Sequence, residues 1–189
     1  MRIRLVNLLL LVAVTAFVFN SCKKTTAQDE INLEQEYLSK YIAKYHPTVK
    51  PKPSGLYFIE TKAGSTAVAD TIKKGDLVKV YYKGYLMKDD PTSGIMDGTE
   101  FDNSGEFEPF AVSVGAGAVI AGWEEGLTYM KDSSEAKLVI PSKLAYSSTP
   151  QASVPAYSPL VFYIKVVKVY RTTDSLPTIQ LLPKTLLKR

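Results

Sequence analysis

Few side chains in this 189-residue sequence are suited to covalent or metal chemistry. It contains one histidine, His46, and one cysteine, Cys22. A Ser-His-Asp triad needs a histidine beside its nucleophile, and zinc sites draw mainly on His and Cys. Because His46 stands in a proline-rich connector, we expect neither a triad nor a metal site in the folded domain. A glycine-rich phosphate loop of recognised spacing is also absent, so no cofactor is expected.

Two adjacent carboxylates, Glu124 and Glu125, stand in the segment VIAGWEEGLTYM. Sequence neighbours on a helix do not face one another, so we expect both groups to be solvated rather than paired for acid-base catalysis. The same segment predicts a short helix with a single apolar stripe. The residues of that stripe are Val119, Ile120, Trp123, Leu127 and Met130.

Segments of alternating polarity surround this helix. In DLVKVYYKGYL, the side chains of Val78, Val80 and Tyr82 share one face, which predicts a strand with Tyr82 on the core side. GLYFIET and LVFYIKVVKVY also read as strands, and PFAVSVG and EAKLVIP as half-buried antiparallel strands. Many strands around one helix, without βα alternation, indicate an α+β fold with an antiparallel sheet covering the helix. The core-facing residues of the later strands are expected to be Phe110, Val112, Val114, Ala136, Leu138, Ile140, Leu160, Phe162, Ile164 and Val166.

The remaining stretches frame this domain. Apolar and tyrosine residues three and four apart predict a helix of about three turns within residues 31–46, which nearby prolines end. Residues 88–98 are rich in turn formers and are expected to form a flap or a long hairpin loop. We therefore divide the chain after its first 21 residues into a tether (22–30), a helix with a Pro-rich connector (31–54), the α+β domain (55–171) and a tail (172–189).

Residues 1–21 have the layout of a secretory signal, with two arginines before an apolar run too short to span a membrane. Cys22 then resembles the lipobox cysteine of bacterial lipoproteins, which is lipid-modified, although Phe19 and Asn20 depart from the commonest lipobox pattern. The alternative is a free thiol beside an ordinary cleavage site. Lipidation would anchor the chain to a membrane of the bacterial envelope. The lack of an acidic cluster after Cys22 favours the periplasmic side of the outer membrane.

The charge balance gives no sign of a nucleic-acid partner. The net charge is +4, and it falls to +2, from 21 basic and 19 acidic residues, once the signal is removed. No dense stripe of Lys and Arg is present, so we expect a mixed, soluble surface and no nucleic-acid binding.

Six strings occur in one order along the domain: YYKGYL, DGTEFDNS, PFAVSVG, VIAGWEEGL, AKLVIPSKLAY and LVFYIKVVKV. Together they resemble the FKBP family of peptidyl-prolyl cis-trans isomerases over about Gly75 to Val169. The resemblance implies a strongly curved antiparallel sheet wrapped around one short helix, here with an N-terminal helical extension. It also implies an apolar cleft for the proline ring of polypeptide clients, and it raises macrolides as inhibitors.

The resemblance also implies the site residues, position by position. Trp123 would form the floor of the cleft and Asp102 a polar group at its rim. The Tyr146 hydroxyl and the Ile120 backbone N–H would donate to a substrate carbonyl. The walls would come from Tyr82, Phe101, Phe110, Val119, Ile120, Tyr146, Val154 and Phe162. Two alternatives stay open: Asp102 as a turn residue bonded near Asn103 and Ser104, and some of the phenylalanines as core packing alone.

The activity so implied is isomerisation of X-Pro bonds during the folding of envelope proteins. Ser147, where the family usually has Gly, and Ala156, where a second Pro is common, depart from the pattern, and an insertion at residues 88–97 lengthens a loop beside the cleft. Because binding can survive where catalysis is weak, the main alternative is an FKBP-like chaperone or binding module with little isomerase activity. A third is a structural envelope lipoprotein whose helix at 31–46 docks a partner or pairs with itself.

Overall fold

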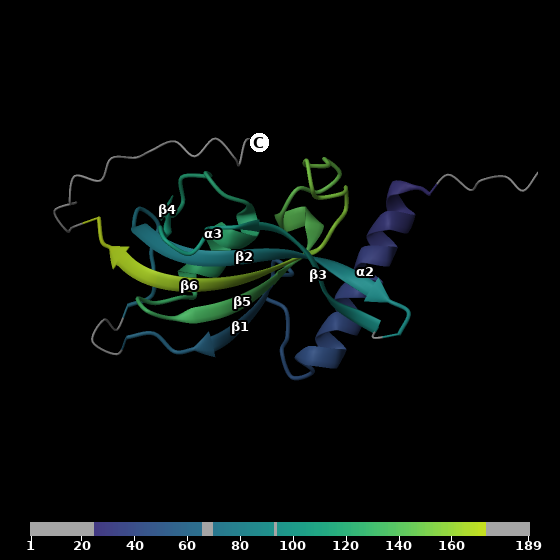
Figure 1. The fold of residues 1–189 in the computed structure, drawn as a ribbon, viewed down its shortest axis with the longest axis horizontal. Coiled ribbons are helices and arrows are strands. Elements are labelled where there is room, and N and C mark those ends of the chain that lie inside the picture. Colours follow the sequence, from purple (N-terminus) through teal and green to yellow (C-terminus); the bar gives the residue numbers. More distant parts are fainter. Residues whose placement is uncertain (1–24, 66–69, 93, 173–189) are drawn as a thin grey trace, which may run out of the picture.

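The computed structural model describes residues 25–65, 70–92 and 94–172. The expected signal peptide, Cys22 and the tail from residue 173 onward lie outside this part of the chain. The elements, in chain order, are α2 (Ala27–Tyr45), β1 (Tyr57–Lys62), β2 (Leu77–Asp90), β3 (Gly94–Asn103), β4 (Phe110–Ser113), α3 (Ala121–Thr128), β5 (Glu135–Ile140), the 3-10 helix η1 (Ser142–Leu144) and β6 (Leu160–Tyr170) (Figure 1).

The strands form one antiparallel sheet in the order β1-β5-β6-β2-β3, with β4 also paired to β2. Strand β2 changes partner along one edge: its first residues, Leu77 to Val80, pair with β4, and those from Lys83 to Asp90 pair with β3. Its other edge pairs with β6 from Leu77 to Leu86. The sheet curves around α3 (Figure 1), which confirms the predicted α+β fold with an antiparallel sheet covering a short helix.

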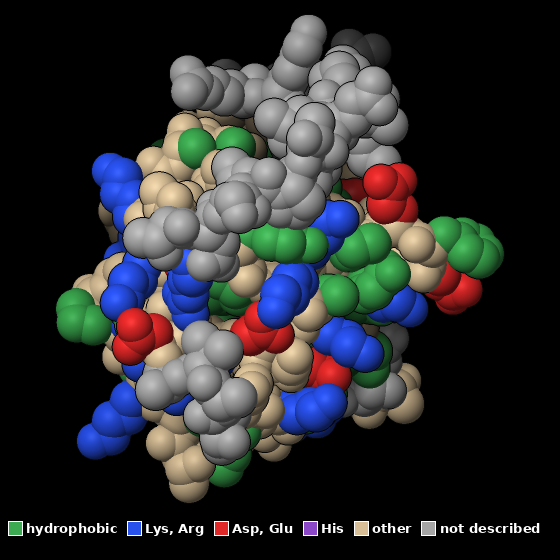
Figure 2. Space-filling model, turned by 90° about the vertical axis from the view of Figure 1, so that its left-hand side faces the viewer, with side chains coloured by type: hydrophobic (Ala, Val, Ile, Leu, Met, Phe, Trp, Pro, Cys, Tyr) green, Lys and Arg blue, Asp and Glu red, His purple; other side chains and the backbone are tan. Residues whose placement is uncertain are grey.

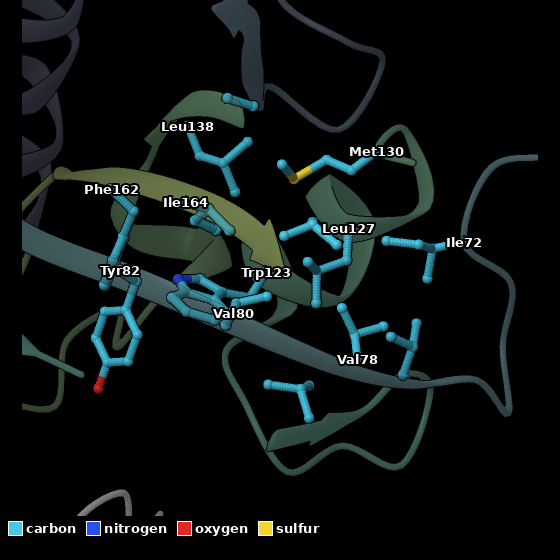
Figure 3. Close-up of a cluster of buried hydrophobic side chains, with 14 of the residues drawn as sticks. Ile72, Val78, Val80, Tyr82, Trp123, Leu127, Met130, Leu138, Phe162 and Ile164 are labelled. Carbon is cyan, nitrogen blue, oxygen red and sulfur yellow. The ribbon is translucent and has the colours of Figure 1, made fainter. Parts of the chain in front are cut away.

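The face of the sheet turned toward α3 forms the main core (Figure 3). Val78, Val80 and Tyr82 are buried there, as their alternation in β2 predicts. Trp123 and Leu127 of α3 pack among them. The expected inner residues of the later strands are buried as well, with Phe110 half-buried; the buried ones are Val112, Val114, Ala136, Leu138, Ile140, Leu160, Phe162, Ile164 and Val166.

Helix α2 covers the opposite face of the sheet at the end that carries Val139 of β5 and Val161 of β6, whereas Tyr163 and Lys165 of β6 stay exposed. Val139 and Val161 are 0% exposed and pack in one cluster with apolar residues of α2. The expectation that β5 is half-buried is therefore wrong, because a second helix covers the face that its alternate residues occupy. The α2 residues in this cluster are Leu38, Tyr41 and Ile42. These three residues of α2 thus pack inside the molecule, whereas Ile31, Leu33 and Tyr45 of the same helix are exposed.

Helix α2 begins earlier than predicted because a capping box starts it. Thr26 Oγ1 accepts a hydrogen bond from the N–H of Asp29 (3.2 Å), and the Asp29 carboxylate accepts one from the N–H of Thr26 (2.9 Å). Residues 27–30 are consequently helical and do not belong to the expected tether. At the other end the N–H of His46 donates to the carbonyl of Ile42 (2.8 Å), and a proline follows.

Residues 88–98 form strands rather than a flap. Strands β2 and β3 stay paired as far as Asp90 and Gly94, so the connection is confined to the three residues between them. Ile95 is buried against α2, and the Lys44 ammonium donates to the Ile95 carbonyl (3.2 Å). The hairpin is extended because α2 gives it an apolar surface to pack on, which the local sequence does not reveal.

Asp97 of β3 gathers three hydrogen-bond donors between α2 and the sheet. Its carboxylate accepts hydrogen bonds from the hydroxyls of Tyr41 and Tyr163, and it lies 3.4 Å from the Lys137 Nζ. The Lys137 ammonium also lies 4.9 Å from the ring centroid of Tyr41 and 4.7 Å from that of Tyr163, a cation–π arrangement. Burial lowers the pKa of Lys137 and raises that of Tyr41, and the Asp97 charge opposes the first shift and adds to the second.

Replacing Asp97 by alanine should lower the free energy of unfolding by about 3–5 kcal/mol, because Lys137 would remain as an unpaired buried charge. Urea denaturation at pH 7 measures this loss. Asp89→Ala is the matched control on the same hairpin: Asp89 lies 3.6 Å from Lys40 at the surface, and such a pair contributes about 0–1 kcal/mol. Equal losses in the two variants would contradict the role given to Asp97.

Candidate functional site

A cleft lies between α3 and the sheet, and most of the predicted site residues line it. Their side chains come from four strands, from α3 and the turn before it, and from the segment after η1. The lining residues are Tyr82, Asp102, Phe110, Val119, Ile120, Trp123, Tyr146 and Phe162. The free volume of the cleft is about 10 Å³, room for roughly one water molecule.

Two predicted wall residues, Phe101 and Val154, do not line the cleft. Phe101 packs edge-on against Phe162, with 5.6 Å between ring centroids, and so supports one wall. Val154 is buried in the core, where the loop turns inward through paired backbone hydrogen bonds with Gln151. The structure therefore gives Val154 a packing role in place of the expected contact with substrate.

Three aromatic rings meet edge to face at the bottom of the cleft. The Trp123 centroid lies 4.9 Å from that of Tyr82 and 5.2 Å from that of Phe162, with interplanar angles of 88° and 89°. Ring quadrupoles favour this geometry, which holds the indole from two sides. Figure 3 shows Trp123 beside Tyr82, whose hydroxyl points away from the core. The floor expected at Trp123 is thus a packed aromatic surface.

Two glycines let α3 approach the sheet closely enough to place this floor. A Cβ atom at Gly122 would lie 2.5 Å from a methyl carbon of Ile140, and one at Gly126 would lie 2.5 Å from a methyl carbon of Leu138. Both distances are far shorter than an ordinary carbon–carbon contact of about 3.5–4.0 Å. The absence of a Cβ atom at Gly122 and Gly126 therefore allows α3 to lie close to β5.

Glu124 is not solvated in the way the sequence suggested. Its carboxylate accepts hydrogen bonds from the N–H groups of Gly115 (2.5 Å) and Gly117 (2.8 Å). These bonds tie the turn before α3 to the helix that carries the cleft floor. Glu125 accepts a hydrogen bond from the Tyr129 hydroxyl (2.9 Å). The partners of Glu124 are backbone groups of glycines, which residue patterns do not identify.

The polar groups of the cleft lie at its rim. The Tyr82 hydroxyl donates a hydrogen bond to Asp102 Oδ2 (2.8 Å). The turn after Asp102 is held by its neighbours instead: Asn103 Oδ1 accepts from the N–H of Gly105 (2.8 Å), and Ser104 Oγ accepts from the N–H of Tyr82 (3.1 Å). Asp102 therefore faces the cleft, and the alternative that made it the turn residue does not hold.

Two further donors face the cleft without partners. The Tyr146 hydroxyl makes no hydrogen bond to a described residue, and neither does the N–H of Ile120, the N-cap of α3. Burial, and then the nearby Asp102 charge, raise the pKa of Tyr146. Burial, and then the hydrogen bond to Asp102, raise the pKa of Tyr82. Both hydroxyls are consequently protonated at neutral pH, and that of Tyr146 can donate to a ligand.

The segment after Tyr146 follows a strained path. Ser147 has a φ of 54° and Tyr157 a φ of 56°, in the region that favours glycine. Hydrogen bonds hold the turn nevertheless: the N–H of Ser147 donates to the Ser142 carbonyl (2.8 Å), and the N–H of Tyr157 donates to the Ser147 carbonyl (2.7 Å). The serine thus keeps a conformation for which glycine is better suited.

Away from the cleft, the ring of His46 lies 6.3 Å, centroid to centroid, from that of Tyr41. Its Nε2 is buried and unpaired among the described residues, and burial and then the Lys137 charge lower its pKa.

Nowhere in the described ranges do three His, Cys, Asp or Glu side chains group to hold a metal ion. None of the described helices is long and apolar enough to cross a membrane. On the face shown in Figure 2, Lys and Arg side chains are interspersed with acidic and apolar ones.

A hollow of about 380 Å³ on the face of the sheet turned away from α3 is larger than the cleft. Side chains of Tyr81, Lys83 and Tyr163 contribute to its lining, which is largely apolar. We place the functional site in the smaller cleft because only there does an aromatic floor meet a carboxylate and an unpartnered hydroxyl.

Comparison with known proteins agrees with this geometry. Residues 69–167 match the family described as FKBP-type peptidyl-prolyl cis-trans isomerase. Peptidyl-prolyl cis-trans isomerase FKBP2 of Homo sapiens is 38% identical over 104 residues, 54% of this chain and 67% of that protein. The isomerase FkpA of Buchnera aphidicola subsp. Baizongia pistaciae is 36% identical over 134 residues, 70% of this chain and 47% of that protein.

Solved structures give the same result. The crystal structure of FkpA from Escherichia coli matches with a TM-score of 0.62 and 34% identity, covering 77% of this chain and 62% of that one. A peptidyl-prolyl cis-trans isomerase from Pseudomonas syringae pv. tomato matches with a TM-score of 0.62 and 25% identity, covering 79% and 99%. The chain thus spans about half of the Buchnera FkpA and less than two thirds of the Escherichia coli FkpA chain.

Adding one methyl group at Gly126 should destabilise the domain by about 1–3 kcal/mol, because α3 must move away from Leu138 to admit it. Thermal or urea unfolding of Gly126→Ala measures the loss. The control is Ala121→Ser, a small change at an exposed position of the same helix, expected to cost about 0.5 kcal/mol. If Gly126→Ala is as stable as the wild type, the close approach of α3 is not needed.

Proposed function

The chain belongs to the family of FKBP-type peptidyl-prolyl cis-trans isomerases, and from this membership we propose that its cleft acts on X-Pro bonds by non-covalent means alone. One observation carries the proposal: a buried indole, held edge-on by two rings, has polar groups only at the rim above it. Such a surface accepts the apolar proline ring and leaves the neighbouring peptide group beside the polar rim.

The reaction needs no nucleophile. Rotation about a peptide bond meets a barrier of about 18–20 kcal/mol because twisting removes the resonance between nitrogen and carbonyl. The planar amide carries separated charge, which an apolar surface solvates poorly, whereas the twisted amide carries less. A cleft lined by Trp123, Phe110 and Phe162 therefore favours the twisted form, and interactions made only with that form raise the rate.

The polar groups have separate parts in this proposal. The protonated Tyr146 hydroxyl and the Ile120 N–H, both without a partner among the described residues, donate to carbonyl oxygens of the client. Asp102, fixed by the hydroxyl of Tyr82, places a carboxylate close to the substrate carbonyl carbon and nitrogen. Because Tyr82 holds one Asp102 oxygen, the orientation of the carboxylate is set before a client binds.

The rival proposal is an FKBP-like binding module with little turnover. The observation that favours it is the strained Ser147 turn beside Tyr146, at a position where the family usually has glycine. A displaced Tyr146 would weaken catalysis more than binding, since the aromatic floor comes from other elements. The same cleft would then hold proline-containing chains without accelerating their isomerisation.

The purified protein should accelerate cis-to-trans exchange of an X-Pro tetrapeptide. Asp102→Ala should lower kcat/KM about tenfold, the effect of losing one charged interaction worth about 1.4 kcal/mol, and Trp123→Ala should lower it further. Tyr81→Phe, on the neighbouring residue whose side chain faces the other side of the sheet, should stay within about twofold of wild type. A folded wild-type protein without acceleration would leave the binding module as the function.

The relatives named FK506-binding protein 4 support one extension, in which a macrolide occupies the same cleft. FK506 should then compete with the tetrapeptide in this assay, and the Trp123→Ala protein should be less sensitive to it.

We propose further that the protein works in the bacterial cell envelope as a lipoprotein. Support comes from the sequence: a signal-like segment at residues 1–21 ends directly before the chain's single cysteine, Cys22. Acyl chains on Cys22 would hold the domain at a membrane, facing the periplasm from the outer membrane. The clients would be proline-containing envelope proteins folding nearby.

Cells supplied with an alkyne-labelled fatty acid should incorporate it into the wild-type protein but not into Cys22→Ser, because the thiol is the acceptor atom. Click labelling after immunoprecipitation measures incorporation, and density fractionation locates the labelled protein. Equal labelling of the two proteins, or none in either, would rule out a lipid at Cys22.

A further inference from the structure

Glu34 of α2 is a buried carboxylate that links this helix to the segment after β5 by hydrogen bonds. Its side chain is 5% exposed, and its two oxygens accept hydrogen bonds from one residue, Ser142, which lies 108 positions away. Oε1 accepts from the backbone N–H of Ser142, and Oε2 accepts from its hydroxyl (2.6 Å). Glu34 lies outside residues 69–167, which carry the family match.

Ser142 in turn holds the backbone around Tyr146. Its carbonyl oxygen accepts hydrogen bonds from the N–H of Ala145 and from the N–H of Ser147, both at 2.8 Å. Tyr146 stands between these two donors. A continuous set of hydrogen bonds therefore runs from the Glu34 carboxylate, through Ser142, to the N–H groups of Ala145 and Ser147, the residues on either side of Tyr146.

The segment is short and strained, and its other backbone hydrogen bonds are local: the N–H of Thr149 donates to the Tyr146 carbonyl (3.0 Å) and the N–H of Tyr157 to the Ser147 carbonyl (2.7 Å). Helix η1 is three residues long, and Ser147 adopts a φ of 54° that disfavours a side chain. Strained backbone persists where the surrounding structure over-determines it. A carboxylate that engages both the N–H and the hydroxyl at the start of the segment supplies such a constraint, and the 4% exposure of Ser142 keeps water from competing for these bonds.

We propose that Glu34 is a positioning residue of the isomerase site, which holds the Tyr146 segment in register with the cleft through Ser142. The proposal rests on the function proposed above for Tyr146. It assigns a task in the reaction to the N-terminal helix, which reaches the cleft through this one side chain rather than by contact with substrate. Glu34 touches no cleft-lining residue in the hydrogen bonds described, so its effect passes through the backbone.

Three variants test the proposal in the tetrapeptide assay. Glu34→Ala should lower kcat/KM about tenfold, since small displacements of a positioned group are enough for such losses, and the loss should fall mainly on kcat. Glu34→Gln should stay within about twofold of wild type, because its amide can accept from the Ser142 N–H and donate to the Ser142 hydroxyl. Tyr41→Phe removes another buried hydrogen bond of α2, that to Asp97, and should leave kcat/KM within about twofold.

The backbone amide resonances of Tyr146 and Ser147 give a second readout, which does not depend on turnover. Glu34→Ala should shift these resonances and speed their hydrogen exchange, whereas Tyr41→Phe should leave them in place. If wild type were inactive, the function proposed for the site would fail, and these resonances alone would decide whether Glu34 holds the segment. Unchanged resonances and kcat/KM in Glu34→Ala, or equal losses in Tyr41→Phe, would overturn the proposal.

Discussion

Strand β5 is the element on which both helices depend, because it is buried on both faces. Leu138 and Ile140 meet the glycine face of α3, whereas Val139 on the alternate side meets α2. A strand covered in this way cannot shift by one residue without exchanging its two apolar faces. The position of the cleft floor on α3 and the position of α2 are therefore fixed by the same six residues.

This arrangement also explains how a small cleft can hold its shape. The aromatic floor is supported from below by side chains of the sheet and from the sides by edge-on rings. The part of the rim beside α3 and η1 is formed by turns, and there carboxylates hold the backbone by hydrogen bonds. Glu124 holds the turn before α3, and Glu34 holds the turn that carries Tyr146. Hydrogen bonds to carboxylates thus fix these turns, whereas apolar packing fixes the floor.

The alternation of polar and apolar residues predicted which side chains are buried on the face of the sheet turned toward α3. It did not predict the burial on the opposite face. Alternation placed Val78, Val80 and Tyr82 correctly, and helical spacing placed Trp123. The outer burial of β5 was missed because Lys137, at 7% exposure, reads as a solvent-facing residue until its carboxylate partner is known.

Partners far apart in sequence account for the other differences. The hairpin at residues 88–98 looked like a loop because α2, on which it packs, lies about 50 positions earlier. No pattern in the neighbouring sequence predicts the hydrogen bonds between Glu34 and Ser142. Val154 was expected to contact substrate, because the bridge to Gln151 that turns it inward is not evident from the sequence. The resemblance to a family supplied most of the cleft, but α2 lies outside the matched residues, so its contacts had to come from the coordinates.

The sheet order has a consequence for how the chain reaches this state. Strand β6, the last in sequence, lies between β5 and β2 at the centre of the sheet, and α2, the first element described, packs on residues of β5 and β6. A ribosome therefore releases α2 before Val139 and Val161, on which it packs, exist, and the two halves of the sheet cannot join until Leu160–Tyr170 has emerged. Since long loops must close before these contacts form, we expect the described strands to assemble in one late step rather than one after another along the chain. The strand at the centre of the sheet is thus the last of the described strands to become available.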